Sequence, residues 1–147
     1  MLRDTERLGR SGEFVVAAFL SLHSDLVSVV PHGSHADIIA EFDEAMLKFQ
    51  VKTVTQQRLK YKTKNDKKLK NRSGWCLDMR RSGNTVDRNY HSTIDIFALY
   101  IVPLGKLLFE ASSDNTSKTF SDRFVAELDP EKMLLDSVQR ALNRPKK

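Results

Sequence analysis

The sequence predicts a single α/β domain in which a β-sheet is flanked by helices, and three observations support this. The chain has 147 residues, the length of one domain, and shows no internal repeat or linker, so residues 1–147 are expected to form one unit. Apolar residues recur at helical spacing near both ends of the chain. Between these two segments, short apolar and β-branched runs alternate with turn residues, as in a series of strands.

The expected elements follow one another in chain order. An opening helix is capped by Asp4 or Thr5 and ends near His23, and a closing amphipathic helix has Pro130 in its first turn and ends before Pro145. Strands are expected at Leu26 to Pro31, Ala36 to Phe42, Met46 to Thr55, Arg58 to Lys64, Trp75 to Met79, Ile94 to Val102 and Lys106 to Ala111, and loops at 65–73 and 112–121.

The overall composition is that of a soluble globular protein, with 40% hydrophobic and 29% charged residues. The longest apolar runs are too short to span a bilayer and no leader follows Met1, so an intracellular, cytoplasmic protein without a membrane partner is expected. The single cysteine, Cys76, excludes an internal disulfide and a cysteine-rich zinc site.

The net charge of +5 is concentrated in one segment of the chain. From Arg58 to Arg72 there are eight Lys or Arg residues and one acid, Asp66. Such a local excess attracts polyanions, of which nucleic acid is the commonest in cells, although it also suits a solvated loop. The expected DNA-facing residues are Arg58, Lys60, Lys62, Lys64, Lys67, Lys68, Lys70, Arg72, Arg80, Arg81 and Arg88.

Polar residues interrupt the apolar strand at 46–55. Gln50 and Lys52 are two apart and therefore point to the same face, where Asp37 from the start of the preceding strand could join them. The Asp37 carboxylate, the Gln50 amide oxygen and the Val51 carbonyl are ligands that suit Mg²⁺, with Mn²⁺ as a substitute, and Lys52 would orient an attacking water. The alternative is that Asp37 only caps a loop and Lys52 is an ordinary strand-edge cation.

Several motifs together resemble the PD-(D/E)XK nuclease superfamily, and in particular the small homing endonucleases of cyanobacterial group I introns, in which Gln also replaces the Glu of the last motif. The motifs are Gly12-Glu13 in the opening helix, Asp37-Ile-Ile, Phe49-Gln-Val-Lys-Thr53, Asn89-Tyr90 and the segment 94–100. The resemblance implies a restriction-endonuclease-like core, a mixed sheet flanked by helices. One departure is that Ala36, not Pro, precedes Asp37.

The same resemblance implies a function and a site. The chain would be a Mg²⁺-dependent endonuclease that hydrolyses phosphodiester bonds of double-stranded DNA, with Glu13, Asp37, Gln50 and Lys52 as catalytic residues and the metal held by Asp37, Gln50, Val51 and Glu13. One such site cuts one strand, so a homodimer or homotetramer is expected. Two alternatives remain: a structure-selective nuclease similar to Holliday junction resolvases, and a metal-independent DNA-binding module on a decayed nuclease fold.

Overall fold

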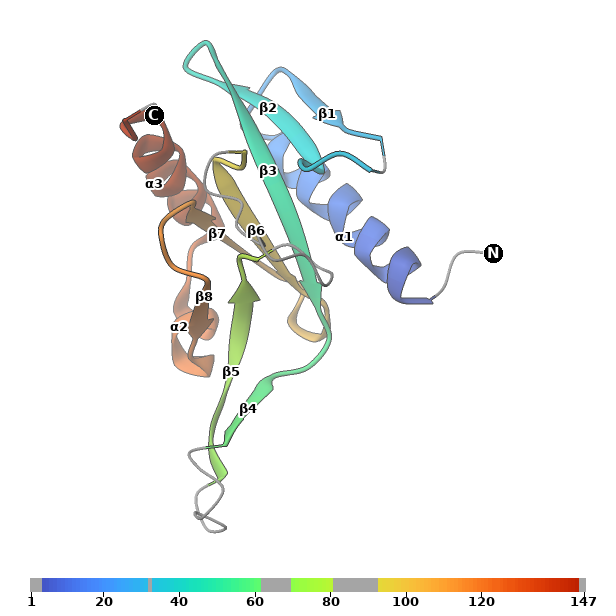
Figure 1. Cartoon of the computed structure of the whole chain (residues 1–147), viewed down its shortest axis with the longest axis vertical. Coiled ribbons are helices and arrows are strands. Elements are labelled where there is room, and N and C mark those ends of the chain that lie inside the picture. The colour runs from blue at the N-terminus through green and yellow to red at the C-terminus, as the bar shows by residue number, and fades with distance from the viewer. Residues whose placement is uncertain (1–3, 32, 62–69, 81–92, 146–147) are drawn as a thin grey trace.

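The chain folds as a mixed α/β structure whose strands form two sheets (Figure 1). The structure is a computed structural model that describes residues 4–31, 33–61, 70–80 and 93–145. Its elements are α1 (Asp4–Leu20), β1 (Val27–Val29), β2 (Ile38–Phe42), β3 (Ala45–Val54), β4 (Arg58–Tyr61), β5 (Lys70–Asp78), β6 (Ile96–Ile101), the 3₁₀ turn η1 (Val102–Leu104), β7 (Lys106–Ala111), β8 (Ser117–Phe120), α2 (Asp122–Glu127) and α3 (Pro130–Leu142). The larger sheet has the order β1-β2-β3-β6-β7 and the smaller one β4-β5-β8.

The long strand β3 lies at the centre of the larger sheet. It is antiparallel to β2 and parallel to β6, which makes the sheet mixed. The turn between β2 and β3 consists of Asp43 and Glu44, whose φ angles of 49° and 61° lie in the left-handed region. Two successive left-handed residues match the twist of the flanking strands, so the turn sets the β2–β3 register, in which Phe42 pairs with Ala45.

Alternate residues of β3 contribute to the two sides of the larger sheet. Phe49 and Val51 belong to the first core, which α1 and α3 cover with residues such as Val16 and Leu134. Gln50 and Lys52 pair in register with residues 97 and 99 of β6, which belong to the second core. Because paired residues of neighbouring strands project to one face, Gln50 and Lys52 point away from α1.

The second core is closed by the smaller sheet and α2. Trp75 and Leu77 of β5, Phe120 of β8 and Val125 of α2 pack there against the larger sheet. Figure 1 shows β4 and the first part of β5 extending from this layer as a two-stranded ribbon along the long axis of the molecule. The second half of β5 pairs with β8, from Trp75 with Phe120 to Asp78 with Ser117.

The apolar elements agree closely with the sequence prediction. Strands β2, β3, β6 and β7 and helix α3 all lie where the hydrophobic pattern placed them, and β7 matches residue for residue. Helix α1 ends at Leu20, and residues 21–23 form a turn instead of a last helical turn. Within the described ranges, no helix combines the length and apolar character needed to cross a membrane.

Two expected loops are wrong in part. Residues 117–120, expected in a loop, form strand β8, and α2 follows at once with Ser121 as its cap, whose Oγ accepts from the N–H of Phe124. Residues 70–73, expected in the other loop, form the first part of β5 and pair with β4. Both segments are polar and are held by backbone pairing, so they lack the apolar alternation by which a strand is recognised.

Gly12 of α1 lets the helix approach β3 closely. A Cβ at this position would overlap Oγ1 of Thr53, whereas a Cβ at Gly9 in the same helix would meet nothing within 4 Å. We therefore predict that Gly12→Ala lowers the free energy of unfolding by about 1–3 kcal/mol, because overpacking outweighs the gain in helix propensity.

Gly9→Ala is the matched control and should raise the free energy of unfolding by about 0.5–1 kcal/mol. Urea denaturation followed by circular dichroism measures both. Equal stabilisation by the two substitutions would contradict the close packing of α1 on β3.

Candidate active site

The carboxylate of Asp37 is fixed against the backbone of β3. Asp37 precedes β2 directly, and its N–H donates to the carbonyl of Phe49 at 2.9 Å. The N–H of Val51 in turn donates to Oδ2 of Asp37 at 2.8 Å. The side chain of Asp37 therefore lies against the backbone between Gln50 and Lys52, the two other residues predicted for this site.

Gln50 contributes a polar atom that lacks a partner. Its Oε1 is buried and accepts no hydrogen bond from the described part of the chain. A buried acceptor left unsatisfied costs about 1–3 kcal/mol, so such an atom calls for a water, an ion or another ligand. A divalent cation would satisfy this oxygen and, close by, the Asp37 carboxylate, so the residues present fit Mg²⁺ chemically.

The candidate ligands are mixed in type. Across the described ranges, no three His, Cys, Asp or Glu side chains gather into a group that could hold a metal. A cation at this place would depend on Asp37, on the neutral Gln50 and on the Val51 carbonyl. Glu13 lies in α1 next to Gly12, on the helix that covers the opposite face of β3, and is partly buried.

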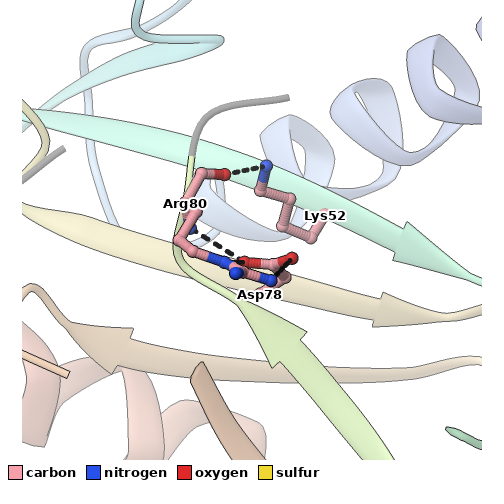
Figure 2. Close-up of polar contacts among 3 residues, drawn as sticks. All are labelled: Lys52, Asp78 and Arg80. Carbon is pink, nitrogen blue, oxygen red and sulfur yellow. Dashed lines mark hydrogen bonds and ion pairs between the residues drawn. The ribbon is translucent and has the colours of Figure 1, made fainter. Parts of the chain in front are cut away.

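Lys52 is held by residues from the end of β5. Its Nζ donates to the backbone carbonyl of Arg80 at 3.2 Å (Figure 2). Arg80 also forms a forked ion pair with Asp78, in which Nε donates to Oδ1 at 3.0 Å and Nη2 to Oδ2 at 3.1 Å. The N–H of Arg80 donates to the same Oδ1 at 3.0 Å, so a single carboxylate fixes both the side chain and the backbone of Arg80.

A second aspartate anchors β3 on its other edge. Asp95 precedes β6 directly, and its Oδ2 accepts from the N–H of Lys48 at 2.8 Å while its own N–H donates to the Lys48 carbonyl at 2.9 Å. Asp95 falls near the start of the strand that the sequence predicted from Ile94 to Val102. The observed bonds align β6 with β3 two residues before Gln50.

Comparison with known proteins identifies the fold. Neither the models of known protein families nor the sequences of curated proteins match this chain. Among solved structures, it is similar to a bacterial homing endonuclease, I-Ssp6803I, with a TM-score of 0.61 and 16% sequence identity over 97% of this chain and 99% of the other. The chain has a homing-endonuclease-like fold. At this level of identity the similarity concerns the fold, and the roles of individual residues depend on the geometry given above.

On this homing-endonuclease-like fold, the predicted DNA-binding residues fall into three groups. Arg58 and Lys60 belong to β4, and Lys70 and Arg72 to the first part of β5, in the projecting ribbon. Arg80 lies next to Lys52 and is paired with Asp78. The third group lies outside the described residues. Its members are Lys62, Lys64, Lys67, Lys68, Arg81 and Arg88.

Asp78 is the residue of this site that the sequence did not reveal. The segment 75–79 was predicted as a strand, and its alternation places Trp75, Leu77 and Met79 in the core. Asp78 and Arg80 occupy the intervening positions, which normally face solvent. Only the folding of β5 towards β3 shows that these two residues lie beside Lys52, because no spacing in the sequence relates them.

The ionisation of Asp78 reflects these contacts. Partial burial raises the pKa of the carboxyl group, but the hydrogen bonds from the side chain and backbone of Arg80, together with the charges of Arg80 and Lys52, outweigh burial and bring the pKa below its usual value. The pKa of Arg80 is raised by the same pairing with Asp78.

This pairing predicts a particular dependence of stability on pH. A carboxyl group whose pKa is lower in the folded state contributes stability that is complete above its unfolded pKa of about 4 and is lost as the pH falls through the folded pKa. The difference in free energy of unfolding between wild type and Asp78→Asn should therefore be constant near neutral pH and shrink below about pH 4. Urea denaturation at a series of pH values measures it, and a difference that grows with acidity would contradict the assignment.

Proposed function

We propose that this protein is a Mg²⁺-dependent DNA endonuclease that hydrolyses phosphodiester bonds. The observation that carries the proposal is the buried Oε1 of Gln50, which accepts no hydrogen bond within the described part of the chain and lies on the strand that carries Lys52 and bonds the Asp37 carboxylate through Val51. The homing-endonuclease-like fold supports it, because the similar structure is that of a bacterial homing endonuclease.

The residues that would hold the metal are Asp37, Gln50 and the carbonyl of Val51. Glu13, the fourth predicted ligand, lies on the helix that covers the opposite face of β3, and the proposed set does not depend on it. Mg²⁺ bound there would act as a Lewis acid towards the scissile phosphate. Asp37 suits this role because the N–H of Val51 already fixes one of its oxygens. A ligand held in this way loses little conformational freedom when the metal binds.

Lys52 would supply the positive charge of the site. Its ammonium group is compact, carries three donors and is directed by the Arg80 carbonyl. Placed next to the phosphate, it would orient the attacking water and neutralise charge that develops on the phosphoryl oxygens. Manganese would substitute for magnesium, since both prefer oxygen ligands.

The basic ribbon would bind double-stranded DNA. A two-stranded antiparallel ribbon fits the major groove, and Lys and Arg side chains along it would contact phosphates. The segment from 58 to 72 carries the eight basic residues. Each site would cut one strand, so a double-strand break would require a homodimer or a homotetramer.

Cleavage assays test the proposal directly. We predict that Lys52→Ala and Asp37→Ala each slow Mg²⁺-dependent cleavage of duplex DNA by about 100-fold or more, because each removes a group that stabilises the transition state. Lys48→Ala is the matched control: Lys48 is an exposed lysine of the same strand, an even number of positions from Lys52, and its replacement changes the charge equally.

The outcomes separate the proposed function from its alternatives. Wild type that cuts no DNA with Mg²⁺, or a Lys52→Ala variant as fast as the control, would contradict the proposal. A strong preference for four-way junctions over linear duplex would assign the site to junction resolution. Binding of DNA without metal uptake, measured by calorimetry, would indicate a decayed module.

The neutral ligand gives a second prediction. Gln50→Glu adds a negative charge at the position of the unpartnered Oε1 and should tighten Mg²⁺ binding by about tenfold, because affinity rises with the number of charged ligands. Gln50→Leu keeps similar bulk but removes the oxygen and should weaken binding. Isothermal titration calorimetry with Mg²⁺ measures both, and equal affinities in all three proteins would place the metal elsewhere.

A further inference from the structure

We propose that Asp78 is a positioning residue for Lys52 and that it acts through Arg80. This inference deepens the proposed function, on which it rests, since Lys52 is the cation of the proposed site. It assigns to the end of β5 a role in catalysis that the sequence pattern of this strand does not predict. Asp78 itself would touch neither the metal nor the DNA.

The first step is the restraint on Lys52. A lysine ammonium sits on four flexible methylene groups, and holding it in one place requires an acceptor of fixed position. One such acceptor is the carbonyl of Arg80, 3.2 Å from Nζ in a partly buried setting (Figure 2). A backbone carbonyl is only as well placed as the residue whose Cα carries it.

The second step is the fixing of Arg80, the residue whose Cα carries that carbonyl. The Asp78 carboxylate accepts three hydrogen bonds from Arg80: one from the backbone N–H and two from the guanidinium. The backbone bond spans two residues and closes a turn, so the orientation of Arg80 follows from the position of Asp78. The fork of the guanidinium prevents the carboxylate from rotating away.

The third step is the support beneath Asp78. It pairs in register with Ser117 of β8, and the neighbouring Met79 donates its N–H to the carbonyl of Thr116 at 2.9 Å. Leu77 and Met79 on either side are buried in the second core. The carboxylate is thus mounted on a packed strand, which is the condition for holding a catalytic group within a fraction of an ångström.

Two other roles could account for the same contacts. The ion pair could be a surface feature without catalytic effect, like the exposed pair of Arg123 and Glu127 on α2. Alternatively, Arg80 could be a phosphate contact that happens to lie near Lys52. The three roles predict different responses to Arg80→Lys, which keeps the charge but cannot form the fork.

The experiment measures single-turnover cleavage and duplex affinity separately for Asp78→Asn and Arg80→Lys. Both variants should cleave about 10–100-fold more slowly with affinity within about twofold of wild type, as when a group that orients a catalytic residue is lost. The double variant should be no slower than the slower single variant, because both changes release one restraint. Glu127→Gln is the control for Asp78→Asn, because it removes the same single negative charge, and it should cleave at the wild-type rate.

A second readout does not depend on cleavage. The ammonium signal of Lys52 in ¹⁵N NMR should be protected from exchange in the wild type and lost in both variants, with backbone spectra showing that they remain folded. The positioning role is overturned if both variants cut at the wild-type rate, if Arg80→Lys alone keeps that rate, if slower cutting is matched by weaker affinity, or if the Lys52 signal is unchanged. Should the wild type cut no DNA, the proposed function fails, and the NMR result still decides whether Asp78 restrains Lys52.

Discussion

The hydrogen bond from the N–H of Val51 to the carboxylate of Asp37 is the constraint on which the site depends. It joins the residue directly before β2 to the middle of β3. The position of the Asp37 side chain and the positions of the neighbouring β3 residues, Gln50 and Lys52, are therefore fixed together. Asp95 does the same on the opposite edge, where it holds Lys48. The central strand is thus fixed by a carboxylate on each side, and Gln50 and Lys52 are presented by backbone that has little freedom to move.

The charges around this strand are arranged in balance. Asp37 and Asp78 are acidic, and Lys52 and Arg80 are basic. Gln50 adds a buried oxygen without adding charge, so the two acids and two bases remain balanced. As a ligand in the proposed site, a neutral side chain would attract a divalent cation less strongly than a carboxylate would. Such a site would depend more strongly on the free concentration of the ion than a site with an additional acid.

The parts of the structure that follow from burial could be predicted, and those that follow from backbone pairing could not. The strands β6 and β7 have apolar runs because both of their faces are covered, whereas β3 alternates between buried and more exposed positions. That alternation placed Gln50 and Lys52 on one face of β3. β8 is exposed at three of its four positions and has no such pattern. The place of Asp78 beside Lys52 is a tertiary relation between β5 and β3, and one sequence contains no signal for it.

The position of β5 in two pairings has a further consequence. Its first part is bonded to β4 and its second part to β8, and the strand ends two residues before the carbonyl that accepts from Lys52. Insertion or deletion of one residue within it would exchange Leu77 and Asp78 between interior and surface. Length variation among natural relatives should therefore avoid this strand, and the same rule guides any effort to graft a new recognition hairpin onto the scaffold.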